Sequence, residues 1–224
     1  MKRLALIAAA TAALLSSFAA LADSASVTQT GAFVSISGGK SHFNVDRDAS
    51  ENARYPSEDR NSTGFGVLGG YRWVVARPFA LGVEAGYVHL GSTTWKAHYG
   101  GLSVQYDDRD KTKVSAFLAG VNGKWDLPYD FTVTAHAGVA HVRAKGEFTQ
   151  TGGWIIQPPS TTRDHHSWSG NRIYGGVGFG YDFNENVGLT LSYDRYSFKA
   201  DGPRDPGHTA HVGLLGLTAE YRFY

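Results

Sequence analysis

The sequence predicts an all-β fold, an eight-stranded antiparallel up-and-down transmembrane β-barrel, and three observations carry this prediction. The 224 residues include 28 Gly, 12 Tyr, 12 Phe and 5 Trp, yet the mean hydropathy is only −0.26. Segments of about ten residues alternate between apolar and polar positions, as expected of a barrel with one face toward lipid and the other toward a polar interior. The connections between these segments alternate between short and long.

Eight segments show this alternation, and none has the three-to-four-residue spacing of an amphipathic helix. Neighbouring side chains of a strand point to opposite faces, so each segment has an apolar face and a more polar face. The segments are Ala32–Phe43, Thr63–Trp73, Phe79–Leu90, Lys113–Trp125, Phe131–Ala144, Ile173–Phe183, Val187–Phe198 and Thr209–Phe223.

The connections supply an independent signal. Three are tight turns rich in Pro, Asp and Asn, which favour turns: Val74–Pro78, Asp126–Asp130 and Asn184–Asn186. Four are long and polar: His42–Ser62, Gly91–Thr112, Lys145–Arg172 and Lys199–His208. Short periplasmic turns and long extracellular loops are typical of outer-membrane barrels. We therefore expect four long extracellular loops and both termini on the periplasmic side.

The first 22 residues predict a cleaved signal peptide, which leaves residues 23–224 as the barrel domain. MKR is followed by the apolar, Ala-rich run Leu4–Phe18 and then by the small-residue site that ends at Ala22. The alternative, a single anchoring helix, is disfavoured because the run is short and alanine-rich. No cysteine follows the small residues, so a lipid anchor is not indicated.

The cysteine content and the charge argue against disulfide stabilisation and against a nucleic acid as partner. The chain has no cysteine, so its stability cannot come from disulfides. Without Lys2 and Arg3, the 21 basic residues fall to 19 against 20 acidic residues, a formal charge of −1. A nucleic acid as partner would require a strongly basic face, which this balance does not favour.

The end of the chain and the aromatic residues fit a barrel that closes on itself. Unpaired backbone groups cost several kcal/mol each in hydrocarbon, so the first and last strands must pair. Aromatic residues gather beside the short turns and the C-terminus, as a girdle at a membrane interface would. These expected interfacial aromatics are Tyr71, Trp73, Trp125, Tyr181 and Phe223.

Four motifs resemble the eight-stranded transmembrane domain of the outer-membrane protein A (OmpA) family. They are GGYR at 69–72, VEAGY at 83–87, the run to VRA at 142–144, and EYRF at 220–223. The resemblance covers nearly the whole mature chain and implies an outer-membrane location and a structural role. The soluble peptidoglycan-binding domain of many members is not expected here. The closing residues Leu217, Ala219, Tyr221 and Phe223 also resemble the signal read by the outer-membrane assembly machinery, with Tyr224 as one additional residue.

The resemblance further implies a network of charged and polar side chains inside the barrel. The candidates are Arg72, Glu84, Asn122, His136, Thr190, Ser192, Asp194, Glu220 and Arg222. Glu84 matches the family's inward glutamate, but Asn122 and Thr190 stand where its cationic partners are expected. Gly180 stands in place of another inward acid of the family, and His136 in place of an inward arginine. A buried charge without partners is costly, so Glu84 is solvated by water, protonated, or paired with another group. We expect a plugged or water-pocketed lumen, with a narrow, weakly conducting pore as the alternative.

Two motifs suggest other chemistry. Gly176-Val-Gly-Phe-Gly180 superficially matches a phosphate-binding loop, but no helix follows it, and we expect its inward glycines to make room for Tyr174 and its neighbours. His165-His166-Ser167 has the His-x-Ser spacing of barrel-type lipid A deacylases. The pair lies in a predicted loop without a matching acid to orient the histidine. We expect solvated loop histidines, no catalytic residue, no metal site and no cofactor.

The long loops carry mixed charges and exposed aromatic residues, namely Tyr55, Trp95, Tyr99, Trp154 and Trp168. Rigid scaffolds often present function on loops. The sequence thus predicts an outer-membrane barrel that supports envelope integrity, with surface adhesion or recognition through its loops. The expected partners are outer-membrane lipids and lipopolysaccharide, the assembly machinery and an extracellular ligand. Alternatives are the narrow pore and, less favoured, a lipid A-modifying enzyme.

Overall fold

The computed structural model describes residues 28–45, 57–101, 104–154, 158–202 and 205–224. The predicted signal peptide, 1–22, and Tyr55 lie outside these residues. Within the described residues, no helix is long and apolar enough to span a membrane. The ordered elements are nine strands and a 3-10 turn: β1 (Gly31–Val45), β2 (Ser57–Asp59), β3 (Asn61–Ala76), β4 (Phe79–Gly100), β5 (Val104–Asp126), η1 (Pro128–Asp130), β6 (Phe131–Trp154), β7 (Ser160–Asp182), β8 (Val187–Gly202) and β9 (Asp205–Phe223).

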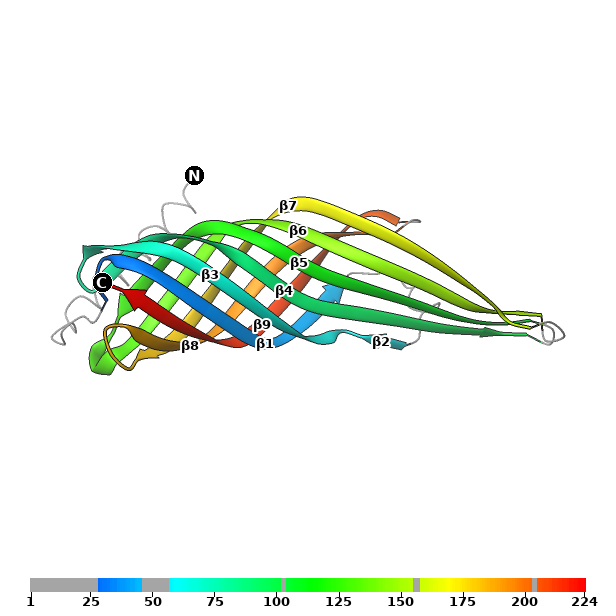
Figure 1. The fold of residues 1–224 in the computed structure, drawn as a ribbon, viewed down its shortest axis with the longest axis horizontal. Helices are drawn as coiled ribbons and strands as arrows, with labels where there is room; N and C mark the ends of the chain where they lie inside the picture. The colour runs from blue at the N-terminus through cyan, green and yellow to red at the C-terminus, as the bar shows by residue number, and fades with distance from the viewer. Residues whose placement is uncertain (1–27, 46–56, 102–103, 155–157, 203–204) are drawn as a thin grey trace, which may run out of the picture.

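Eight long strands form a closed antiparallel ring, which confirms the predicted fold class (Figure 1). Consecutive long strands pair with each other, and β1 closes the ring by pairing with β9 from Ala32↔Phe223 to Val45↔Ala210. The three-residue β2, which the sequence did not predict, pairs with β4. Closure gives every membrane-spanning strand a partner on both edges, which removes unpaired backbone groups from the apolar region.

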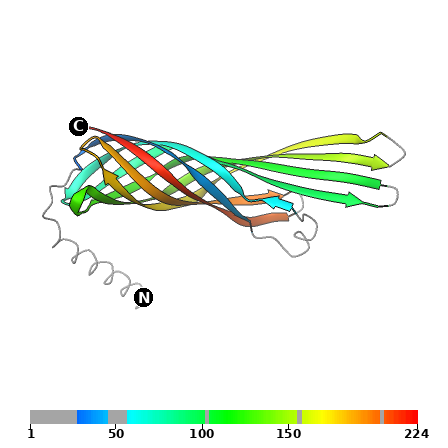
Figure 2. The same ribbon diagram turned by 90° about the horizontal axis from the view of Figure 1, so that it is seen from below.

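The two ends of the barrel differ. One end, the turn end, carries the tight connections at 77–78, 127–130 and 183–186 together with both ends of the described chain (Figure 2). The opposite end, the loop end, carries the connections between β1 and β3, β4 and β5, β6 and β7, and β8 and β9. The connections therefore alternate between the two ends in the predicted order, but by the strand bounds those at 101–103, 155–159 and 203–204 are about as short as the turns. The membrane orientation stays a prediction.

The prediction of long polar loops was wrong for most of their residues. β4 and β5 stay paired from Thr93↔Thr112 to Gly100↔Gln105, and β6 and β7 stay paired as far as Gly152↔Ser160. Likewise, β8 and β9 pair through most of 199–208. Hydrogen bonding between strands does not need a hydrophobic face, so the ladder continues where both faces are polar and the alternation disappears.

These paired residues form an extension beyond the barrel, made of 92–100, 104–113, 145–154 and 160–172 of β4, β5, β6 and β7 (Figures 1 and 2). β7 pairs with β8 only from Tyr174 to Asp182, so the extension is an open four-stranded sheet rather than a continuation of the ring. Trp95, predicted to be an exposed loop aromatic, is instead 4% exposed on its inner face. Trp154 is exposed, as predicted.

An apolar belt covers the outer face of the ring. Its exposed side chains come from every long strand and include Ile36, Val67, Val83, Val121, Val139, Val177, Leu191 and Leu217. Aromatic residues border the belt: near the turn end they include Tyr71, Trp73, Trp125, Tyr181 and Phe223, and toward the loop end they include Phe65, Tyr87 and Phe117. Phe117 and Trp125 are eight residues apart on β5, which corresponds to about 26 Å along a strand.

Candidate functional site

The candidate site is the barrel interior, where the alternate side chains of all eight long strands meet. All nine side chains expected inside, from Arg72 to Arg222, lie on inward positions of the ladder and are buried or half-buried. They form two polar groups, one near the turn end and one in the middle of the barrel. A third, apolar layer lies toward the loop end.

The group near the turn end is an ion-pair network centred on Arg72 and Glu220. The Arg72 guanidinium donates to both Glu220 carboxylate oxygens at 3.0 and 3.1 Å, and its Nε donates to Asn122 Oδ1 at 2.9 Å. The guanidinium also lies 4.4 Å from the centroid of the Phe33 ring. A bidentate ion pair over an aromatic face holds this arginine in one orientation.

Two residues that the sequence did not single out complete this network. Lys124 Nζ donates to both Asp182 oxygens at 3.0 and 2.8 Å, and Arg222 Nη1 donates to Asp182 Oδ2 at 2.6 Å. Lys124 Nζ is also 3.6 Å from Glu220 Oε1. The network thus joins three cations and two carboxylates from β3, β5, β7 and β9. Continuing the two-residue alternation from Asn122 to Lys124 would have identified the lysine from sequence.

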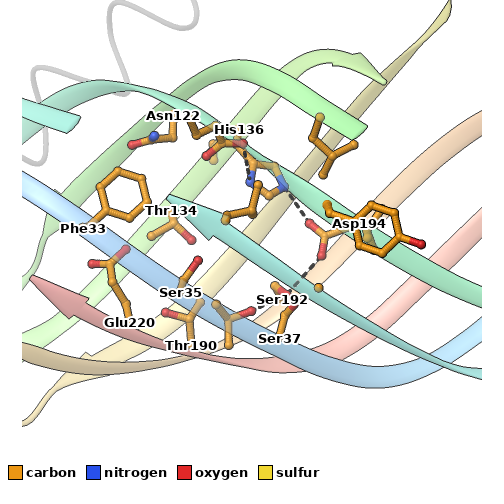
Figure 3. A pocket seen from close by; sticks show the side chains of 18 of the residues that line it. Phe33, Ser35, Ser37, Asn122, Thr134, His136, Thr190, Ser192, Asp194 and Glu220 are labelled. Atoms are coloured by element: carbon orange, nitrogen blue, oxygen red, sulfur yellow. Dashed lines mark hydrogen bonds and ion pairs between the residues drawn. The ribbon is translucent and has the colours of Figure 1, made fainter. Parts of the chain in front are cut away.

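The middle group supplies the partners of Glu84 that the sequence left open. Tyr174 Oη donates to Glu84 Oε1 at 2.8 Å, and His136 Nδ1 lies 3.3 Å from the same oxygen. His136 Nε2 lies 2.7 Å from Asp194 Oδ1, and Ser192 Oγ donates to Asp194 Oδ2 at 3.2 Å (Figure 3). Because a carboxylate faces each ring nitrogen, a doubly protonated His136 donates to both acids.

Inward glycines create the room for this group, although not in the way that the sequence suggested. A Cβ on Gly120 would lie 2.6 Å from Tyr174 Oη, and one on Gly138 would lie 2.8 Å from Tyr174 Cε1. A Cβ on Gly176 would instead collide with Asp194 and His136. The glycine run at 176–180 therefore accommodates the His136–Asp194 pair and its polar neighbours, whereas Gly120 and Gly138 accommodate the tyrosine.

A small cavity of about 70 Å³, lined by both polar and apolar side chains, lies between the two groups (Figure 3). Its lining includes Ser35, Asn122, Thr134, Thr190 and Glu220. A water molecule needs roughly 10–15 Å³ of such space and two to four polar partners. The cavity can therefore hold a few waters.

Toward the loop end, an apolar plug fills the interior. It includes inward side chains from six of the eight long strands, namely Phe43, Val88, Leu90, Val114, Ala116, Leu118, Ala140, Val142, Phe198, Val212 and Leu214. Phe43, Leu90, Val114, Val142 and Val212 have no exposed surface. The plug separates the polar groups from the loop end.

The family assignment follows from the sequence of the whole chain. Residues 9–223 match the model of the "Outer membrane protein beta-barrel domain" family. The chain belongs to this family. The resemblance that its motifs suggested is thereby confirmed at the family level, and the protein is an outer-membrane β-barrel with transmembrane strands.

Solved barrels from several bacteria share limited similarity with this family member. The attachment invasion locus protein Ail of Yersinia pestis is 18% identical, with 87% of this chain and 99% of Ail covered and a TM-score of 0.46. Neisserial surface protein A is 13% identical, with 86% and 97% covered and a TM-score of 0.45. The Escherichia coli outer-membrane protease OmpT is 12% identical, with 86% and 97% covered and a TM-score of 0.47. No functional role transfers from similarity of this degree. No curated protein matches the sequence.

In this outer-membrane barrel, the closing residues form one side of the seam. Leu217, Ala219, Tyr221 and Phe223 lie on the outer face of β9, opposite Gly38, Ile36, Val34 and Ala32 of β1. Tyr221 and Phe223 also contact each other, with ring centroids 4.9 Å apart. The predicted assembly signal is thus part of the last strand pair needed to close the ring.

The location predicted for His165 and Ser167 was wrong. Both lie on β7 rather than in a loop, paired with Glu147 and Lys145 of β6. They are exposed on the outer face, whereas the neighbouring Asp164 occupies an inner position. No hydrogen bond links His165 to Ser167 in the described structure. Among the described residues, no group of three His, Cys, Asp or Glu side chains could hold a metal ion.

Proposed function

We propose that this protein is a structural, non-catalytic outer-membrane barrel with a closed lumen, which supports envelope integrity and presents its extension to surface partners. The apolar plug is the observation that carries this proposal. Its buried side chains fill much of the interior between the polar groups and the loop end. Ions avoid an apolar region because removing their hydration is costly.

The proposal includes an orientation in which the loop end faces the outside and the turn end faces the periplasm. The short turns and the paired chain ends at the turn end support it, because small outer-membrane barrels have short periplasmic turns. In this orientation the plug lies nearest the cell surface, and the extension projects from the membrane.

Single-channel recording in planar lipid bilayers tests the closed lumen. The folded protein should give no discrete conductance steps. A variant with Phe43→Ala and Leu90→Ala, which shortens two plug side chains, should give more frequent current steps. A matched variant with Ile36→Ala and Leu217→Ala loses similar volume from the outer belt and should stay silent. Regular steps from the unmodified protein would overturn the proposal in favour of the narrow pore.

Envelope integrity is tested in cells that lack the protein. Such cells should take up more of a hydrophobic dye, and the protein should restore the barrier whether or not its extension is shortened. Binding to a surface partner should instead be lost when residues 95–109 are replaced by a two-residue turn. Unchanged dye uptake in the deficient cells would remove the integrity role.

Catalysis is the least supported alternative. A serine nucleophile needs a histidine within hydrogen-bond reach and a third group to orient it. His165 and Ser167 are not hydrogen bonded in the described structure, and Asp164 occupies the opposite face. Ser167→Ala should therefore leave the lipid A composition of the outer membrane unchanged.

A further inference from the structure

A groove of about 330 Å³ lies on the outer face of β4, β5 and β6, where the apolar belt meets the extension. The part of the groove nearer the belt is aromatic: the rings of Tyr87 and Phe117 line it with centroids 5.2 Å apart. The part nearer the extension is cationic and contains Lys113, Arg143 and Lys145. The groove is therefore amphipathic, with its apolar part toward the belt.

The strand register orders these side chains in successive rows. Tyr87 lies opposite Phe117, which lies opposite His141 on β6. One row further from the belt, His89, Ser115 and Arg143 lie side by side. The groove thus becomes more positively charged over the two rows that follow the aromatic residues.

In the next row, Lys113 lies directly opposite Lys145. Directly opposite residues have Cβ atoms about 4.5–5.5 Å apart, and like charges there are destabilising. No carboxylate of the described residues forms an ion pair with Lys113, Arg143 or Lys145, whereas Arg72, Lys124 and Arg222 in the interior each have such a partner. An anion between the two lysines would relieve their repulsion.

We propose that this groove binds the phosphate groups of lipid A in the outer leaflet, with the acyl chains alongside Tyr87 and Phe117. This proposal rests on the orientation given above, which places the groove at the level of the outer-leaflet headgroups. A phosphate at Lys113 and Lys145 supplies the missing negative charge, and Arg143 can donate to it through two N–H groups. The site thereby assigns lipopolysaccharide, expected as a partner, to particular residues.

Cations outnumber carboxylates on the outer face next to the groove. Asp108 and Asp110 point to the inner face of β5, while Lys111 and Lys113 point outward, with Glu147 outward opposite Lys111. Farther from the membrane, Lys96, Arg109 and Arg163 occupy one outward row. That distal row is beyond the groove and equally cationic, so it serves as a matched control.

The test compares two triple variants of the folded protein in detergent micelles. The groove variant carries Lys113→Gln, Arg143→Gln and Lys145→Gln; the distal variant carries Lys96→Gln, Arg109→Gln and Arg163→Gln. The probes are bis-phosphorylated lipid A, dephosphorylated lipid A and a heparin fragment. Each cation near an anionic lipid surface strengthens binding about fivefold, so the groove variant should bind bis-phosphorylated lipid A about a hundredfold more weakly. The distal variant should bind it as the unmodified protein does.

Three outcomes would overturn the proposal: equal binding of dephosphorylated lipid A, retained binding by the groove variant, or tighter binding of heparin that depends on the distal row. The last outcome would assign the surface to a soluble polyanion instead.

A single variant gives an independent test if the triple variant does not fold. Lys145→Gln should raise the unfolding temperature without lipid A, because it removes the lysine repulsion, and should reduce the increase that lipid A produces. A decrease without lipid A contradicts the proposal. Silent bilayer recordings from all these variants would show that the closed lumen stands independently of the groove.

Discussion

Tyr174 on β7 donates a 2.8 Å hydrogen bond to Glu84 on β4, two residues that are 90 positions apart in the sequence. Both lie in a layer where Gly120 of β5 and Gly138 of β6 have no side chains, so the phenol reaches across these two intervening strands. A buried carboxylate without such a donor is costly. The barrel therefore satisfies its inward glutamate with a neutral hydroxyl and His136 rather than with a lysine or arginine.

Tyr174→Phe should destabilise the barrel by about 1–3 kcal/mol, since it removes the hydroxyl donor from a buried charged acceptor and leaves His136 as its partner. The difference is measured as the shift in the urea midpoint between the folded and unfolded bands on a semi-native gel. Tyr193→Phe removes a hydroxyl from a residue that is 50% exposed on the outer face and should have little effect. Equal shifts for the two variants would mean that the Glu84 contact contributes nothing.

The glycines beneath Tyr174 should tolerate no side chain. Gly120→Ala places a Cβ 2.6 Å from Tyr174 Oη, so the tyrosine must leave Glu84 or the strands must separate. We expect a lower unfolding midpoint and a smaller folded fraction. Gly69→Ala is the matched control, because its Cβ meets only one atom, at 3.6 Å. Combining Gly120→Ala with Tyr174→Phe should cost less than the sum of the two single changes, because they disturb the same contact.

Arg72 and Glu220 should be strongly coupled. Breaking a buried ion pair by removing one partner typically costs about 3–5 kcal/mol. We therefore expect the double variant, Arg72→Met with Glu220→Gln, to lose less stability than the sum of the losses of the two single variants. A double-mutant cycle on the unfolding free energy measures the coupling. Additive effects would show that Lys124, 3.6 Å from Glu220, replaces the arginine fully.

Phe223→Ala should reduce the amount of protein assembled in the outer membrane. Phe223 lies opposite Ala32 at the seam and contacts Tyr221, so it acts at the last pairing that closes the ring. The readout is the fraction of heat-modifiable protein in the membrane. Phe183→Ala removes an equally exposed aromatic at the same end but outside the seam, and should assemble normally. Similar losses in both variants would mean that Phe223 contributes only as an interfacial aromatic and has no special role at the seam.

The membrane-spanning part of the fold was predictable because lipid acts on one face only. In Val187–Phe198, for example, Leu189 and Leu191 alternate with Thr190 and Ser192, and the structure places them on opposite faces of β8. The extension was not predictable in this way. Both of its faces are polar at residues such as Arg109 and Asp110, so the strand ladder continues without a hydrophobic period.

The interior partners were harder to predict than the inward positions. Period-two alternation places Glu84, His136 and Asp194 inside, but whether they meet depends on the register of five strands. Register is set by all pairings together and by the turns, not by any one segment. Lys124 was accessible from the alternation alone, whereas the contact between Tyr174 and Glu84 required the assembled ring.

Orientation in the membrane tests the central claim most directly, because both the closed surface barrel and the groove depend on it. The chain has no cysteine, so a single cysteine can report its own accessibility. Gly153→Cys at the loop end has an open environment, and Glu185→Cys lies in a turn at the turn end. Intact cells are treated with a large membrane-impermeant maleimide, and heat modifiability confirms that each variant is folded. We predict labelling at 153 in intact cells and at 185 only after the outer membrane is opened. Labelling at 185 in intact cells, with 153 protected, would contradict this account.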